Sequence, residues 1–170
     1  MLVVGAGGLG SPVLLYLSAA GVGYLTILDD DVVDESNLQR QVIHRQADVG
    51  RPKALSAKDA VQRLNTHLVA EAVVARLGTD NALDLVKDHG LILDCTDNFT
   101  TRYLASDAAE ITGTPLVWGT ILQYQGQLSV FWPDRGPCYA ICSPRFPPLI
   151  QCRRPLLEAH SARSSVRWDR

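Results

Sequence analysis

Four glycines near the N-terminus have the spacing of a phosphate-binding turn. They form Gly5-Ala6-Gly7-Gly8-Leu9-Gly10, a G-x-G-x-x-G pattern between the apolar run 2–4 and a helical run over residues 11–20. Because glycine has no Cβ, main-chain N–H groups of such a turn can approach a phosphate at the positive end of the helix. A tight strand-to-helix turn without a ligand is the alternative. Asp29 ends the next apolar run 19 residues after Gly10, close to the ~20 residues expected for a ribose-binding acid, which favours a nucleotide.

A second polar segment indicates that the glycines are only part of the site. Asp29 opens the run DDDVVDESNLQRQ, residues 29–41. An NAD enzyme needs little more than the glycines and one acid, so this dense run favours a different nucleotide chemistry. Three further motifs follow along the chain: DVGRPK at 48–53, DCTDN at 94–98 and GPCY at 136–139.

These segments resemble the motifs of the ThiF/MoeB/HesA family, the bacterial relatives of ubiquitin-activating enzymes. Residues 29–41 resemble its D-x-D-x-V-x-x-S-N-L-x-R-Q signature, and residues 48–53 resemble its V-G-x-P-K. Residues 94–98 match its D-C-T-D-N, and residues 136–139 resemble the start of its G-P-C-Y-x-C zinc motif. The resemblance covers residues 2–139, about four fifths of the chain.

The resemblance implies a reaction and its participants. The family uses ATP and Mg²⁺ to adenylate the C-terminal glycine of a ubiquitin-like sulfur-carrier protein with a Gly-Gly end, in molybdopterin or thiamin-type cofactor biosynthesis. Its members form homodimers. Displacement at the α-phosphate builds negative charge on the phosphate oxygens, so positioned cations and Mg²⁺ are expected to supply most of the catalysis.

The resemblance also implies roles for single residues. Arg40 and Lys53 would grip the phosphates and Asp97 would hold Mg²⁺, which makes these three the catalytic residues. Asp29 would bind the ribose, with Asn37 and Gln41 in support. Besides Gly5, Gly7, Gly8 and Gly10, the residues implied to contact ATP are Asp29, Asp31, Asn37, Arg40, Gln41, Lys53, Asp97 and Asn98.

Each of the three catalytic candidates has a structural alternative. Lys53 could be a solvated residue at a helix start, although a cation there is unfavourable near the helix dipole. Arg40 could form a surface ion pair with Asp34 or Glu35, and Asp97 could cap the following helix.

We assign no catalytic role to Cys95 or to the histidines of the chain. Cys95 is expected to be a small buried residue beside a strand end. The four histidines show no metal-ligand spacing, and we assign no function to them; they are His44, His67, His89 and His160.

Strand and helix signals alternate around these motifs. Beyond the elements that flank the glycines, strands are predicted over 24–28, 68–74, 91–93, 115–118 and 127–132, and helices over 53–64, 81–86 and 101–110. This order predicts an α/β fold with a Rossmann-like, doubly wound, mostly parallel sheet. By resemblance it is an incomplete sheet of the ubiquitin-activating-enzyme type.

The composition narrows the class of protein. The chain has 170 residues, 46% apolar and 20% charged, which is typical of one globular core. No apolar run reaches the ~18 residues of a membrane span, so no membrane helix is expected. A formal net charge of -2 gives no support for nucleic-acid binding. Four cysteines without a secretory signal indicate a reduced, cytoplasmic protein.

The C-terminal part of the chain has a different composition. Residues 1–136 hold 10 basic and 16 acidic side chains, whereas residues 137–170 hold six arginines, two acids, five prolines and no glycine. Three residues separate Cys138 from Cys142, where the zinc motif has two. We therefore expect that the family's four-ligand Zn²⁺ site, to which Cys138 would belong, is not intact.

This change of composition suggests a domain boundary. We expect a partial adenylyltransferase domain over residues 1–139 and a non-homologous, disordered tail over 140–170. A frameshift near residue 140 would explain the tail, and we also expect Met1 to be an internal or miscalled start. The family's preceding helical segment, whose arginine reaches the partner's ATP site, has no expected counterpart here.

Two alternatives to adenylation of a sulfur carrier stay open on the sequence. The chain could be a truncated, inactive nucleotide-binding remnant of such an enzyme. It could also be an NAD-dependent oxidoreductase, which the glycine pattern alone permits.

Overall fold

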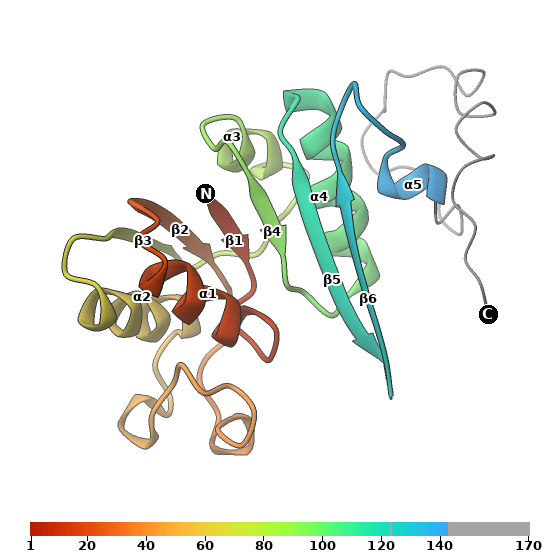
Figure 1. Cartoon of the computed structure of the whole chain (residues 1–170). Coiled ribbons are helices and arrows are strands. Elements are labelled where there is room, and N and C mark those ends of the chain that lie inside the picture. The colour runs from red at the N-terminus through yellow and green to blue at the C-terminus, as the bar shows by residue number, and fades with distance from the viewer. Residues whose placement is uncertain (123, 143–170) are drawn as a thin grey trace.

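A computed structural model describes residues 1–122 and 124–142 as a single sheet flanked by helices (Figure 1). The elements in chain order, with η for a 3₁₀-helix, are β1 (Leu2–Val4), α1 (Gly10–Ala19), β2 (Tyr24–Leu28), η1 (Glu35–Asn37), η2 (Gln46–Asp48), α2 (Lys53–Leu64), β3 (Val69–Val73), α3 (Ala82–Val86), β4 (Ile92–Asp94), α4 (Phe99–Thr112), β5 (Leu116–Leu122), β6 (Gln125–Phe131) and α5 (Tyr139–Cys142).

The sheet has the order β3-β2-β1-β4-β5-β6. Strands β1 to β5 are parallel, and β6 runs antiparallel to β5. The chain crosses from β1 to β2 on one side and enters β4 on the other, so strand order reverses at β1. Ligands of doubly wound sheets bind in the crevice at the carboxyl ends of the strands at such a reversal. The predicted fold class is confirmed.

The three residues of β1 face two separate cores. Leu2 and Val4 pack in the cluster that includes α3 and α4, whereas Val3 packs in the cluster that includes α1 and α2. All three are buried. A strand covered on both faces needs apolar side chains at every position, which explains the continuous run Leu2–Val4.

Helix α4 is longer than the sequence predicted. The Asn98 side chain caps its N-terminus by accepting a hydrogen bond from the Thr101 N–H at 2.8 Å. Gly113 ends it in the left-handed conformation, with φ of +74°. The prediction of 101–110 is therefore too short at both ends, because the capping residues Asn98 and Gly113 set where the helix begins and ends.

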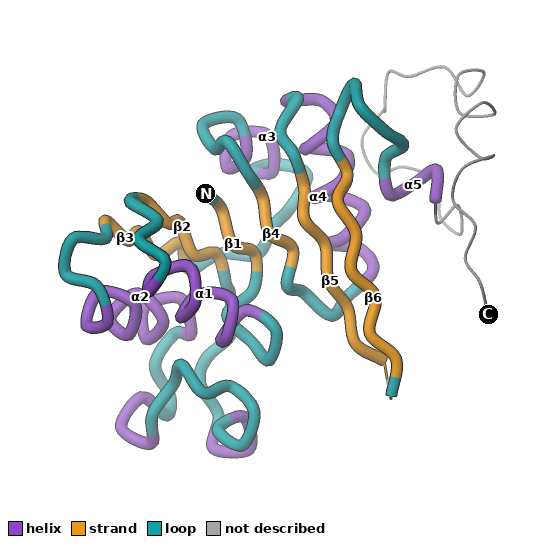
Figure 2. Tube along the Cα trace, viewed as in Figure 1, coloured by secondary structure: helices purple, strands orange, loops and turns teal. Residues whose placement is uncertain are grey.

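One face of the β5–β6 hairpin has no covering helix in the part of the chain that the structure describes (Figures 1 and 2). Leu116, Trp118 and Phe131 face the α4 side and are buried. Leu128 on the opposite face is 73% exposed. The hairpin therefore combines a packed face with an exposed apolar one. Among the described helices, none has the length and hydropathy needed to cross a membrane.

We expect Gly113→Ala to lower the free energy of unfolding by about 1 kcal/mol, because alanine is strained at positive φ. Gly90→Ala is the matched control: a Cβ there also meets open space, and Gly90 does not have positive φ. It should be neutral or slightly stabilising, since alanine restricts the unfolded chain. Urea unfolding measures both variants. Equal losses would contradict the role of φ at Gly113.

Candidate nucleotide-binding site

A cleft of about 610 Å³ opens at the carboxyl ends of β1, β2 and β4. Ten of the residues predicted to contact ATP line it: Gly5, Gly7, Gly8, Asp29, Asp31, Arg40, Gln41, Lys53, Asp97 and Asn98. They come from segments as far apart as residues 5 and 98, and the reversal of strand order at β1 brings them together. Gly10 and Asn37 are not among the lining residues.

The glycine loop between β1 and α1 uses its glycines in two ways. Gly5 has φ of +95°, and a Cβ there would lie 3.2 Å from the Cys95 carbonyl oxygen. A Cβ on Gly10 would collide with the Gly5 carbonyl. At Gly7 and Gly8 a Cβ would clash with nothing, the nearest atoms lying at 3.7 and 3.9 Å. Gly5 and Gly10 thus shape the turn, whereas Gly7 and Gly8 leave space on the cleft side.

Asp29 fixes the glycine loop against the end of β2. Its Oδ2 accepts a hydrogen bond from the Ala6 N–H at 2.7 Å, and its Oδ1 accepts one from the Asp31 N–H at 2.9 Å. Burial raises the pKa of the Asp29 carboxyl, and these two hydrogen bonds oppose that rise. The remaining lone pairs of the carboxylate can accept hydrogen bonds from ribose hydroxyls.

Lys53 is a buried cation on the wall of the cleft. It is the first residue of α2, is 6% exposed, and its Nζ lies 2.8 Å from Asp31 Oδ2. The alternative of a solvated lysine is therefore wrong. A lysine this buried at the positive end of a helix needs an anionic partner, and in the absence of a ligand Asp31 provides it.

Arg40 and Gln41 lie on the turn after η1 and face the glycine loop. Arg40 donates from Nη1 to the Ser36 carbonyl at 3.2 Å. Among the described residues it forms no ion pair with Asp34 or Glu35, so its charge is available to a ligand. Gln41 is buried, and among the described residues its Oε1 has no hydrogen-bond partner. An unsatisfied buried acceptor beside a polar cleft points to a donor supplied by a ligand or water.

Asn37 has a different position from the one expected. Its side-chain amide contacts Ser36 Oγ at 3.4 Å, outside the cleft lining. Its main-chain carbonyl accepts hydrogen bonds from the N–H groups of Arg40 and Gln41 at 3.1 and 2.9 Å. Asn37 therefore shapes the turn that presents these two side chains.

Asp97 is an exposed carboxylate on the opposite wall. The residue that caps α4 is Asn98, so the capping alternative for Asp97 is wrong. No group of three metal-binding side chains occurs within residues 1–122 and 124–142. Mg²⁺ commonly keeps several waters and binds through one or two carboxylates plus substrate phosphates, so Asp97 beside bound phosphates fits that ion.

The sequence analysis missed Arg102, a buried residue of α4 that lines the cleft. Its Nη2 donates to the Thr96 carbonyl at 3.0 Å and to Thr120 Oγ1 at 2.6 Å. The guanidinium also lies 5.3 and 5.5 Å from the ring centroids of Phe99 and Trp118. Arg102 therefore ties the DCTDN segment to β5. The available signal was its position one helical turn after Asn98.

The described residues include three cysteines, Cys95, Cys138 and Cys142. Burial, together with the charge of Asp94, raises the pKa of the Cys95 thiol to about 12, so it stays protonated near neutral pH. Cys138 is buried. Cys142 is exposed, and Cys152 lies outside the described residues. The expectation about Zn²⁺ stays a prediction, and we derive nothing from that metal.

Comparison with known proteins identifies the family of this chain. The model of the ThiF family matches residues 1–156. The chain belongs to the ThiF family. The match runs past residue 139, where the sequence suggested a boundary; the tail beyond residue 142 is outside the described part of the chain, and its origin stays a prediction.

Several curated ThiF-type proteins are similar in sequence. The chain is 60% identical over 134 residues to the "Probable adenylyltransferase/sulfurtransferase MoeZ" of Mycobacterium tuberculosis, covering 79% of this chain and 34% of that protein. It is 48% identical over 153 residues to the "Sulfur carrier protein adenylyltransferase" of Thermus thermophilus, covering 87% and 56%. The chain thus spans about a third to just over half of these relatives.

Solved structures agree with the fold. E. coli MccB, in a crystal structure with MccA-N7isoASN, has a TM-score of 0.76 at 20% sequence identity, covering 82% of this chain and 42% of that chain. At this identity the likeness supports the ThiF-type fold alone.

We expect Asp97→Ala to change the free energy of unfolding by less than about 0.5 kcal/mol, because its carboxylate does not cap α4. Asn98→Ala removes the cap and should cost about 1 kcal/mol. Urea unfolding of the two variants side by side measures the difference. A loss at Asp97 as large as that at Asn98 would restore the capping interpretation.

Proposed function

We propose that this chain binds ATP with Mg²⁺ in the cleft and adenylates the C-terminal glycine of a ubiquitin-like sulfur carrier. The observation that supports the proposal best is that two cations, Lys53 and Arg40, line the same cleft as the glycine loop. Asp97, a carboxylate that does not cap α4, lines this cleft as well. Sequence similarity to the Thermus "Sulfur carrier protein adenylyltransferase" supports the substrate class.

The reaction would be a displacement at the α-phosphate. A carboxylate oxygen of the carrier forms a bond to the α-phosphorus, and the bond to the leaving pyrophosphate breaks. Negative charge grows on the non-bridging and leaving oxygens, which Lys53 and Arg40 stabilise by position and charge. Asp97 holds Mg²⁺, which when bound neutralises further phosphate charge. A carrier ending in Gly-Gly suits this site because an unbranched tail can approach a phosphate without side-chain clashes.

The decisive experiment is carrier-dependent ATP–pyrophosphate exchange. We expect Lys53→Ala to lower the exchange rate by ~10²-fold or more, as for loss of one preorganised charge-stabilising group. Lys87→Ala is the matched control, because Lys87 is exposed and its ion pair within the described part of the chain is with Asp84. Equal rates for the two variants would contradict the assignment of Lys53.

The exchange assay tests the first alternative, and an NAD-binding measurement tests the second. An inactive remnant would bind ATP but give no exchange with any sulfur carrier. An NAD-dependent oxidoreductase would bind NAD tightly, and its affinity would not depend on Arg40 or Lys53. Both cations line the same cleft as the glycine loop, which favours a triphosphate over a dinucleotide.

We also propose that a second copy of the chain covers the open face of the β5–β6 hairpin. That face carries Ile121, Leu128 and Val130, which are 64%, 73% and 59% exposed. Two copies of such an exposed apolar face can pack against each other around a two-fold axis.

Sedimentation equilibrium tests this interface. We expect the chain to be a dimer and Leu128→Glu to shift it toward monomer by more than about tenfold in dissociation constant, because a charge would be buried on the apolar face. Gln127→Glu places the same charge on the neighbouring residue, which points to the other face of β6, and should leave the dimer intact. A monomer at all concentrations, or equal effects of the two variants, would contradict the proposal.

A further inference from the structure

His44, to which the sequence analysis assigned no role, joins three parts of the nucleotide site. It is 5% exposed. Its Nε2 lies 3.0 Å from the Ala6 carbonyl oxygen in the glycine loop, 38 residues away in the chain. Its Nδ1 lies 2.9 Å from Ser56 Oγ in the first turn of α2. Both ring nitrogens are therefore used in bonds to segments that line the cleft.

The partners determine the tautomer of the ring. A carbonyl oxygen only accepts, so Nε2 carries the proton and donates to Ala6. In the neutral ring Nδ1 is then the acceptor, and the Ser56 hydroxyl donates to it. The Ala6 N–H in turn donates to Asp29, so this one residue of the glycine loop is held on both sides.

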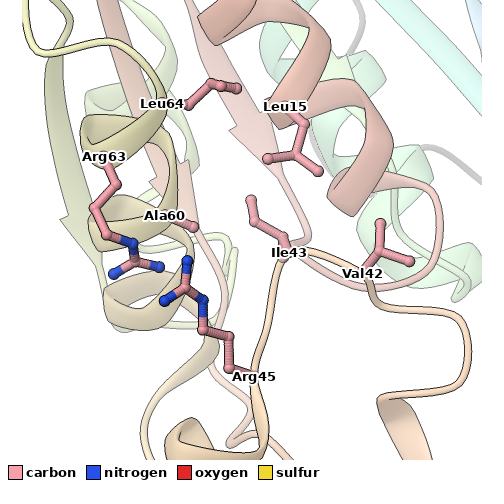
Figure 3. A pocket seen from close by; sticks show the side chains of 7 residues that line it. All are labelled: Leu15, Val42, Ile43, Arg45, Ala60, Arg63 and Leu64. Atoms are coloured by element: carbon pink, nitrogen blue, oxygen red, sulfur yellow. The ribbon is translucent and has the colours of Figure 1, made fainter.

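The turn that carries His44 is anchored from its other side. The His44 N–H donates to the Gln41 carbonyl at 3.1 Å, which links the ring directly to the Arg40–Gln41 turn. Figure 3 shows Ile43, the preceding residue, between Leu15 of α1 and Ala60 of α2. With Ile43 packed in this groove, the backbone at residue 44 has little freedom to follow a displaced ring.

We propose that His44 is a positioning residue for ATP, which holds the glycine loop, the Arg40–Gln41 turn and the start of α2 in one fixed arrangement. This inference rests on the proposed function, because it assigns the phosphate-binding groups to those three segments. Lys53 and Ser56 lie in the same first turn of α2. A ring that bonds Ser56 and Ala6 therefore sets the position of the Lys53 ammonium relative to the glycine loop.

The surroundings favour the neutral form of the ring. Burial lowers the pKa of His44, and the charge of Lys53 adds to that effect, against the Ala6 hydrogen bond and the carboxylates of Asp29 and Asp48. Because the folded pKa lies below the unfolded value, the unfolded chain takes up the proton first as pH falls. Folding stability from this group is thus present above about pH 6.5 and decreases below it.

Two amide substitutions distinguish the hydrogen bond at Nε2 from the one at Nδ1. In His44→Gln the amide nitrogen reaches about as far as Nε2 and can still donate to Ala6. In His44→Asn the amide reaches only the position of Nδ1, so the bond to Ala6 is lost. His67→Gln, at an exposed histidine, is the matched control.

The experiment is an equilibrium titration of the full chain with ATP and Mg²⁺, far below the unfolding temperature of every variant. We expect His44→Asn to raise the dissociation constant of ATP about tenfold, the effect of losing one buried hydrogen bond to the loop. His44→Gln should stay within about twofold to threefold of the wild type, and His67→Gln should not differ from it. Amide hydrogen exchange should increase at residues 5–8 in His44→Asn and not in His44→Gln.

The outcomes are separable from the proposed function. Equal ATP affinities for His44→Asn and His44→Gln, whether both normal or both reduced, would overturn the positioning role, because a packing role does not distinguish the two amides. Normal ATP binding with the expected split, but no carrier-dependent exchange, would overturn the adenylation reaction and keep the role of His44. A wild-type chain that does not bind ATP would overturn both.

Discussion

The parallel pairing of β1 with β2 on one side and β4 on the other is the constraint on which the site depends. The three residues of β1 are buried between two helical layers, with Leu2 and Val4 in one core and Val3 in the other. Because strand order reverses here, the loops that leave β1 and β4 diverge, and a cleft remains between them. The glycine loop and the DCTDN segment form its two walls.

The charges of this cleft are arranged around one ion pair, in which the lysine is buried and the carboxylate is exposed. Burying an ammonium costs free energy unless an anion accompanies it, and Asp31 accompanies Lys53 while remaining mostly exposed itself. A bound phosphate offers Lys53 a second anion at the same position. Arg40 and Asp97 are exposed and form no ion pair among the described residues, so neither charge is committed to a partner there.

The sequence predicted the elements well where the signal is local. The run Leu2–Val4 and the helix Lys53–Leu64 were placed at their observed bounds, since apolar runs and helical periodicity lie within each segment. Strand β5 was predicted to end at residue 118, but pairing with β6 extends it to Leu122. That pairing depends on a neighbouring strand, which the residues of the segment itself do not encode.

For the site, the types and spacing of residues by themselves indicated the glycine turn and Asp29, and the resemblance to a known family singled out Arg40, Lys53 and Asp97. Tertiary structure decided what each group does before a ligand binds. It buried the Lys53 side chain and paired its ammonium with Asp31, and it made Asn98, rather than Asp97, the cap of α4. It also gave His44 a role, because its hydrogen-bond partner Ala6 is 38 residues away. Hydrogen bonds between distant segments form only when a fold brings them together, and the spacing of residues along a chain does not encode them.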